Sequence, residues 1–232
     1  MRRHTFVSII LIAALVLGLA SCGEPECQHR DADDDMICDN CGDEYYDGAE
    51  GGTSGLVYTL LDDDSYSITN YLGRTAAVVI PATYGGKPVT SIGDRAFRDC
   101  SVLTSVTIPS SVTSIGEDAF RNCVALTTVV MGDGVKTIGK WAFGSCSSLS
   151  KIVIPDGVVS ISEGAFWNCT SLVSVVIPAS VTAISAYAFS YCSALKSINY
   201  RGTDRQWLAI AKVHSWNEST EGYAVTCFYK GK

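Results

Sequence analysis

The feature that most constrains this chain is a repeat of 23 residues. Segments 91–100 (SIGDRAFRDC) and 114–123 (SIGEDAFRNC) are nearly identical and lie 23 positions apart. The same interval recurs without a slip in columns of isoleucine, phenylalanine, cysteine and leucine: Ile92, Ile115, Ile138, Ile161 and Ile184; Phe97, Phe120, Phe143, Phe166 and Phe189; Cys100, Cys123, Cys146, Cys169 and Cys192; Leu103, Leu126, Leu149, Leu172 and Leu195. A fixed period of this size predicts a solenoid, in which each coil stacks on the next.

Each coil is expected to contain a strand with one buried face. In residues 103–109 (LTSVTIP), Val106 and Ile108 alternate with polar residues, so apolar and polar side chains point to opposite faces. Pro109 ends the strand because it has no N–H for the ladder. Segment 116–120 (GEDAF) then predicts a short helical or 3₁₀ turn. The chain is therefore expected to form a β-rich solenoid of 23-residue coils, with a parallel sheet on one side and short turns on the other.

The repeat resembles a known family. The unit L-x-x-V-x-I-P-x-x-V-x-x-I-G-x-x-A-F-x-x-C is similar to the BspA-type leucine-rich repeat of bacterial surface proteins. The resemblance implies an N-terminal β-hairpin cap at 55–79, repeats at 80–197 and a mixed C-terminal cap at 198–232. Caps are also a physical requirement, because a terminal coil would otherwise expose its core.

Residues 1–22 are expected to be a lipoprotein signal peptide. Arg2 and Arg3 precede an apolar run at 6–20, which is too short for a comfortable membrane span. The run ends in Leu-Ala-Ser-Cys, which resembles a bacterial lipobox with Cys22 as the lipidated residue. We therefore expect an extracytoplasmic protein held at the bacterial cell envelope by a lipid anchor in the membrane. A simple secreted protein is the alternative.

The negative charge of the chain lies mainly in an expected tether at 23–54. Residues 23–50 hold 11 acidic residues and one basic residue, whereas residues 51–232 hold 13 acidic and 14 basic residues. A nucleic-acid-binding protein needs a basic patch that contacts phosphates. This charge distribution therefore predicts that nucleic acid is not a partner.

The tether contains a candidate zinc site. Its cysteine and histidine residues follow the pattern Cys-x-His-x8-Cys-x2-Cys, and they are Cys27, His29, Cys38 and Cys41. Three thiolates and one imidazole can complete the tetrahedral shell that Zn²⁺ prefers. The gap of eight residues is shorter than in common zinc ribbons, and a disulfide in an exported tail is the alternative. No cofactor is expected to be required elsewhere.

The repeat cysteines are expected to be small buried hydrophobic residues rather than disulfides. Their side chains run parallel in register, and five thiols cannot all pair. Cys227 falls in the expected C-terminal cap, where it is predicted to be unpaired or buried.

The sequence does not predict an enzyme. His4 would be removed with the signal peptide, and His29 lies among cysteines. His214 has no thiol or carboxylate at a spacing typical of a catalytic pair. No nucleophile elbow, phosphate loop or paired carboxylates occur. Binding is the better hypothesis, because solenoids have a large surface relative to their core. The resemblance implies adhesion to a host or bacterial surface protein or glycan, and a non-catalytic spacer or scaffold is the alternative.

Two surfaces are candidates for the partner. The first is a stripe of outward valines on the expected sheet, although sheet propensity alone also explains valine there: Val130, Val153 and Val176. The second is a group of aromatic residues between the repeated isoleucine and cysteine of successive coils: Trp141, Trp167, Tyr187 and Tyr191. An earlier coil has Asp118, Arg121 and Asn122 in these slots, which predicts that the slots are open to water. Grouped exposed aromatic residues often mark recognition, and covering the C-terminal cap with Trp207 is the alternative role.

Overall fold

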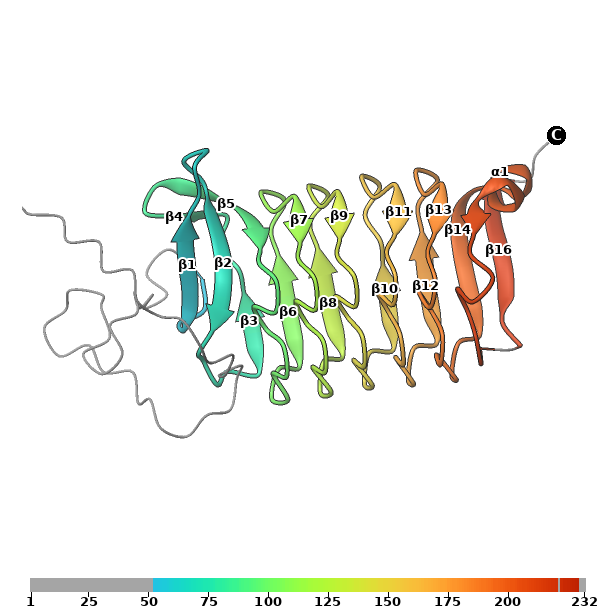
Figure 1. Ribbon diagram of the computed structural model, residues 1–232, viewed down its shortest axis with the longest axis horizontal. Helices are drawn as coiled ribbons and strands as arrows, with labels where there is room; N and C mark the ends of the chain where they lie inside the picture. Colours follow the sequence, from blue (N-terminus) through green and yellow to red (C-terminus); the bar gives the residue numbers. More distant parts are fainter. Residues whose placement is uncertain (1–51, 221, 230–232) are drawn as a thin grey trace, which may run out of the picture.

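The computed structural model describes residues 52–220 and 222–229, which form an elongated stack of coils in chain order (Figure 1). A hairpin covers the N-terminal end of the stack, and a helix with further strands covers the C-terminal end. This architecture confirms the predicted solenoid.

The longer strand of each coil joins a parallel ladder. Between repeats, partner residues in this ladder are 23 positions apart, as for Val106 and Val129 or Val175 and Ile198. At its two ends the offset is larger, 28 for Val78 with Val106 and 27 for Ile198 with Val225. Inward residues such as Val106 and Ile108 are buried, as the alternation predicts, whereas Val129 and Met131 are partly buried. The strands form two sheets. The first contains β3 (Ala77–Val79), β6 (Ser105–Ile108) and β8 (Thr128–Met131). The second contains β10 (Lys151–Val153), β12 (Ser174–Ile177), β14 (Ser197–Thr203) and β16 (Ala224–Tyr229).

Each coil also contains a second, shorter strand that the sequence analysis did not predict. These strands form a further parallel ladder along the stack, and most of them are two residues long. Two residues are too few to show an alternating pattern in the sequence. The strands are β5 (Lys87–Ile92), β7 (Ser114–Ile115) and β9 (Thr137–Ile138), then β11 (Ser160–Ile161), β13 (Ala183–Ile184) and β15 (Ala211–Lys212).

The remaining side of each coil consists of consecutive turns instead of a continuous helical segment. Bonds of the 3₁₀ type do occur, because the amide of Arg98 donates to the carbonyl of Arg95 at 3.0 Å and that of Cys100 to Phe97 at 3.2 Å. Arg95 and Asp99, however, both have positive φ, of 62°. A residue in the left-handed region interrupts a right-handed helix. The same two positions have positive φ in each following repeat through residue 191.

Both ends of the stack are closed by caps. Strands β1 (Leu56–Leu60) and β2 (Tyr66–Tyr71) form the antiparallel hairpin that the resemblance implied, and β4 (Thr83–Tyr84) pairs with β5. At the other end, Thr203 and Gln206 form a capping box that starts helix α1 (Asp204–Ala209). The caps also close the phenylalanine column, since Tyr71 packs on Phe97 and Trp216 meets Phe189 edge to face.

The core is built from the repeated residues. The phenylalanine rings stack along the axis with centroids 4.8, 5.1, 5.6 and 5.4 Å apart in chain order. All five are fully buried, as are the repeated leucines, isoleucines and alanines beside them, which are at most 2% exposed. A single apolar core therefore runs the length of the stack.

Four repeat cysteines are buried free thiols, as the sequence analysis predicted: Cys123, Cys146, Cys169 and Cys192. Each thiol also donates a hydrogen bond to a phenylalanine carbonyl in the preceding coil, at 3.0 to 3.2 Å. Cysteine therefore satisfies a backbone acceptor as well as filling space. The prediction is wrong for Cys100, the first cysteine of the column, which is buried but disulfide-bonded. Cys227 is free and half-buried.

The stack has one discontinuity in its strand ladders. Within the described residues, no strand pairing links β8 with β10 or β9 with β11, although β8 and β10 lie side by side (Figure 1). The turn side stays closed at this junction, since the amides of Trp141 and Phe143 donate to the carbonyls of Glu163 and Ala165, both at 2.9 Å. The spacing of Phe143 and Phe166, 5.6 Å, is also the widest in the column.

Candidate binding edge

The structure brings three of the predicted aromatic residues into contact along the turn side. The ring centroids of Trp141 and Trp167 are 5.7 Å apart, and those of Trp167 and Tyr191 are 5.9 Å apart. Both pairs are edge to face, an arrangement that aromatic quadrupoles favour. These residues and Tyr187 form the surface that we call the aromatic edge. It spans three consecutive coils, as predicted.

The aromatic edge is open to solvent. Tyr187 and Tyr191 are 37% and 43% exposed, and Trp141 and Trp167 are half-buried. Gly164 makes room for Trp141, because a Cβ at that position would collide with the indole ring. The ring of Trp141 therefore lies over the following coil.

Three of the aromatic residues occupy unfavourable backbone positions. Trp141, Tyr187 and Tyr191 have φ of 56°, 59° and 61°. Equivalent positions in other coils hold residues such as Asn122 and Asn168, which tolerate positive φ better. A non-glycine residue in this region costs roughly 1–3 kcal/mol, and such residues concentrate at functional sites. Backbone preference therefore does not explain the aromatic side chains.

The backbone amides of the aromatic edge are hydrogen-bonded, those of Trp141, Tyr187 and Tyr191 to neighbouring coils and that of Trp167 within its own coil. The amide of Trp141 donates to Glu163, that of Gly164 to Ala186, and that of Tyr191 to Glu218, at 2.9 to 3.0 Å. No strand edge is available here for a partner to extend. A ligand at this surface would be recognised by side chains.

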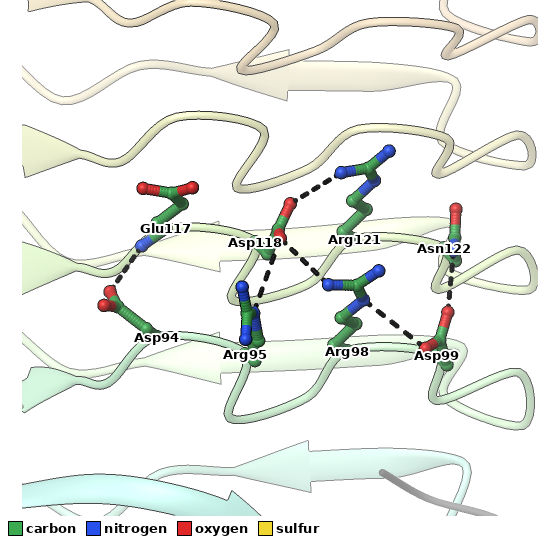
Figure 2. Close-up of polar contacts among 8 residues, drawn as sticks. All are labelled: Asp94, Arg95, Arg98, Asp99, Glu117, Asp118, Arg121 and Asn122. Atoms are coloured by element: carbon green, nitrogen blue, oxygen red, sulfur yellow. Dashed lines mark hydrogen bonds and ion pairs between the residues drawn. The ribbon is translucent and has the colours of Figure 1, made fainter. Parts of the chain in front are cut away.

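In the preceding coils, the turn side carries a charged cluster (Figure 2). It consists of Asp94, Arg95, Arg98, Asp99, Glu117, Asp118, Arg121 and Asn122. Nη1 of Arg98 donates to Oδ2 of Asp118 at 3.0 Å, and Nη1 of Arg121 donates to Oδ1 at 3.1 Å. Nε of Arg95 lies 3.7 Å from Oδ2. Asp118 is only 4% exposed. The prediction that its slot is open to water is therefore wrong, because three guanidinium groups cover the carboxylate.

Further contacts in this cluster link positions one period apart. Nδ2 of Asn122 donates to Oδ1 of Asp99 at 2.7 Å, and the Glu117 amide donates to Oδ1 of Asp94 at 2.7 Å. Figure 2 shows these pairs bridging two neighbouring coils. These contacts link neighbouring coils. They also pair most charges of the cluster with opposite charges or polar groups of the protein itself.

Arg121 connects the charged cluster with the aromatic edge. Its guanidinium carbon lies 5.4 Å from the ring centroid of Trp141, within the range of a cation–π contact. Arg95, Arg98 and this role of Arg121 were not predicted from the sequence. The 23-residue period could have indicated that the charged cluster and the aromatic edge lie on the same side. It aligns Asp118 with Trp141, and Arg121 with Gly144 and Trp167.

Comparison with known proteins identifies the repeat. Residues 79–204 match the family described as "BspA type Leucine rich repeat region", in six copies. The chain belongs to this family of BspA-type repeat proteins.

Solved structures of similar proteins agree with this assignment. A leucine-rich repeat protein of T. pallidum is 38% identical, with a TM-score of 0.61 over 64% of this chain and 72% of that chain. A leucine-rich cell surface protein of Faecalibacterium prausnitzii is 37% identical, with a TM-score of 0.63 over 67% of this chain and 40% of that chain. The pneumococcal vaccine antigen PcpA, at 17% identity and a TM-score of 0.61, shares the fold. No curated protein is significantly similar to this chain.

In this BspA-type repeat protein the valine stripe lies on the longer strands. Val130 and Val153 are 52% and 38% exposed, and Val176 is half-buried. Val79 in β3 is also exposed and lies in the same column, but Thr107 separates it from Val130. Because the ladder is interrupted between β8 and β10, the stripe is divided between two sheets.

Trp207 does not join the aromatic edge. Its ring contacts Tyr200 and Trp216, and Trp216 contacts Tyr223, so the cap has an aromatic cluster of its own. Among the described ring contacts, none links Trp207 with Trp141 or Trp167. Covering the C-terminal cap therefore does not account for the two edge tryptophans.

The predicted anchor and zinc ligands lie outside the described residues: Cys22, Cys27, His29, Cys38 and Cys41. In the part of the chain that the structure describes, no three His, Cys, Asp or Glu side chains come together as metal ligands. No helix among those residues is long and apolar enough to cross a bilayer.

Proposed function

We propose that this protein is a lipid-anchored, extracytoplasmic adhesin that binds a host or bacterial surface protein or glycan through its aromatic edge. The observation that carries the proposal is the contact chain Trp141–Trp167–Tyr191, which is solvent-accessible, spans three coils and lies outside the repeated core columns. Aromatic side chains contribute large contact areas with little entropy to lose, and they dominate many binding surfaces.

The surroundings support a binding role. A leucine-rich cell surface protein of F. prausnitzii is similar to this chain, and the predicted lipobox at Cys22 supports the same kind of location. The repeated positions are occupied by core residues, so no catalytic role is proposed.

A spacer or scaffold without a tight ligand is the second candidate. It is favoured by the largely paired charges beside the aromatic edge, because such pairs stabilise the stack without any partner.

A comparison of two variants tests the proposal. The soluble chain from residue 23 is used to capture binders from host matrix proteins, glycans and co-resident bacteria. The double variant Trp141→Ser with Trp167→Ser should keep its circular dichroism spectrum and lose the captured partner. Val153→Glu, on the exposed valine stripe, should retain it.

The opposite pattern would assign the partner to the valine stripe. Failure of the parent chain to bind saturably to anything in the panel would support the spacer.

A further inference from the structure

We propose that the aromatic edge binds an extended, uncharged polysaccharide, with successive pyranose rings following the rise of the coils. This inference rests on the proposed function, because it takes the same surface and names its ligand class. It depends on the spacing of the rings, on the side chains beside them and on their charge.

The spacing of the aromatic edge fits a polymer that advances by one unit per coil. The rings along the edge are 5.7 and 5.9 Å apart, and the core phenylalanines show that the coils themselves advance by 4.8 to 5.6 Å. A pyranose residue in an extended chain is close to this length. A ligand with this spacing can meet one ring on each coil, and because successive rings are turned by 77° and 71°, it meets ring faces and ring edges in alternation.

Peptides do not share this spacing. An extended strand advances by about 3.3 Å per residue, and polyproline II advances by about 3.1 Å per residue. Either chain falls out of step with the edge after one coil. A peptide would also have to bind without extending a strand, since the backbone amides of the edge are already hydrogen-bonded.

The side chains beside the rings suit a carbohydrate. Asn168 lies next to Trp167 and donates from Nδ2 to Oγ of Ser145 at 3.3 Å. Lys140 and Glu163 flank Trp141 and form an exposed pair, with Nζ and Oε2 3.3 Å apart. Amide, carboxylate and ammonium groups can bond to vicinal hydroxyls, while the aromatic rings contact the C–H faces of the sugar.

The charges at the edge favour an uncharged chain over an acidic one. Lys140 is paired with Glu163, and Arg121 is paired with Asp118 while also lying over Trp141. Asp99 is held by Arg98 and Asn122. The cations next to the rings thus already have partners, and a carboxylate or sulfate on each sugar would have to compete for them.

Binding of defined oligosaccharides tests the inference. The probes are β-1,4-linked gluco-, xylo- and N-acetylglucosamine oligosaccharides of two to six residues, measured by calorimetry and by tryptophan fluorescence on the soluble chain. For at least one series, affinity should rise with length until the three coils of the edge are covered, and then level off. Emission should shift on binding, because Trp141 and Trp167 lose water.

Variants assign the binding to the edge. Trp167→Ala removes the central ring and should weaken binding about tenfold, whereas Trp167→Phe keeps a stacking face and should restore most of the affinity. Val153→Glu is the control on the sheet face and should bind as the parent does. Melting curves check that each variant is folded.

Three results would overturn the inference: no oligosaccharide binds at millimolar concentration, affinity does not depend on length, or Trp167→Ala binds as the parent does. If a captured host protein is nevertheless lost in the double tryptophan variant, the proposed function stands and only the ligand class is wrong. Binding of a proline-rich peptide with the same sensitivity to Trp167→Ala would assign the edge to a protein partner.

Discussion

Phe143 lies at the middle of the core, between Phe120 and Phe166, with ring centroids 5.1 and 5.6 Å away. It contacts a neighbouring coil on both sides, so its side chain holds three coils together. If the ring were removed, the neighbouring coils could not easily move in to fill the cavity, because backbone hydrogen bonds fix both of them.

We expect Phe143→Ala to lower the free energy of unfolding by about 3–5 kcal/mol. Most domains have only about 5–15 kcal/mol in total, so the variant should melt far below the parent or fail to fold. Thermal and urea denaturation measure the effect. Phe143→Leu, which keeps most of the buried volume, should cost clearly less; an unchanged melting temperature for Phe143→Ala would contradict the core described above.

The four buried thiols should make the protein sensitive to alkaline pH. Burial raises the pKa of the Cys123 and Cys192 thiols to about 12, and it raises the pKa of Cys146 and Cys169 well above the ordinary value. The unfolded thiols release protons near their ordinary pKa of about 8.5. Stability from these groups is therefore fully present below about pH 8.5 and falls as pH rises toward 12, by up to about 1.4 kcal/mol per unit for each thiol.

Melting temperatures between pH 7 and pH 10.5 test this dependence. Cys169→Ala removes one of the four thiols, so its melting temperature should fall less steeply than that of the parent above pH 9. Parallel curves for the two proteins would mean that tyrosine or lysine, rather than the cysteine column, causes the alkaline loss.

At the scale of elements, the junction between the coils that contain Phe143 and Phe166 differs from the others. The amides of Thr182 and Ser185 donate to the carbonyls of Val159 and Ile161 in the preceding coil, both at 2.9 Å. The equivalent amide bonds of Val159 and Ser162 are missing among the described residues. The Ser162 hydroxyl instead donates to the carbonyl of Ile138 at 2.6 Å. A glycine column also ends here, since Gly93, Gly116 and Gly139 precede Ser162.

We expect Ser162→Ala to destabilise the protein by about 1 kcal/mol, because it removes a hydrogen bond that replaces a missing backbone bond. Ser185→Ala is the matched control, since the Ser185 amide makes that backbone bond itself, and it should change stability by less than about 0.5 kcal/mol. Hydrogen exchange gives a second measurement: amides in 150–162 should exchange faster than those in 173–185. Equal exchange in the two segments would show that the ladders are continuous in solution.

At the scale of the whole molecule, the proposed adhesin needs to be held at the cell surface. The described solenoid is nearly neutral, and the predicted anchor at Cys22 lies outside the described residues. Anchoring by more than one acyl chain would be stable, since each buried methylene contributes roughly 0.8 kcal/mol.

We expect Cys22→Ala to leave the protein unprocessed by the lipoprotein signal peptidase and unlabelled by a clickable fatty acid. Metabolic labelling followed by gel fluorescence measures this in cells that express either form. Equal labelling of variant and parent would exclude Cys22 as the lipidated residue and favour the secreted alternative.

The sequence by itself determined the period, the identity of the core columns and the strand with alternating residues. These features could be derived because every coil places the same residue type in the same environment, so the signal is repeated five times. The contact between Trp141 and Trp167 was also predictable, because residues about one period apart must lie on neighbouring coils.

Only the tertiary structure decided the features that depend on distances between backbones of different coils. The burial of Asp118 requires arginines from two coils to close over it, and no local pattern reveals that closure. The second strands are too short to alternate, and positive φ at Arg95 and Asp99 breaks what would otherwise be a helical turn. The interruption of the ladders between β8 and β10 and between β9 and β11 is a further feature of this kind, because strand pairing depends on how closely two coils approach.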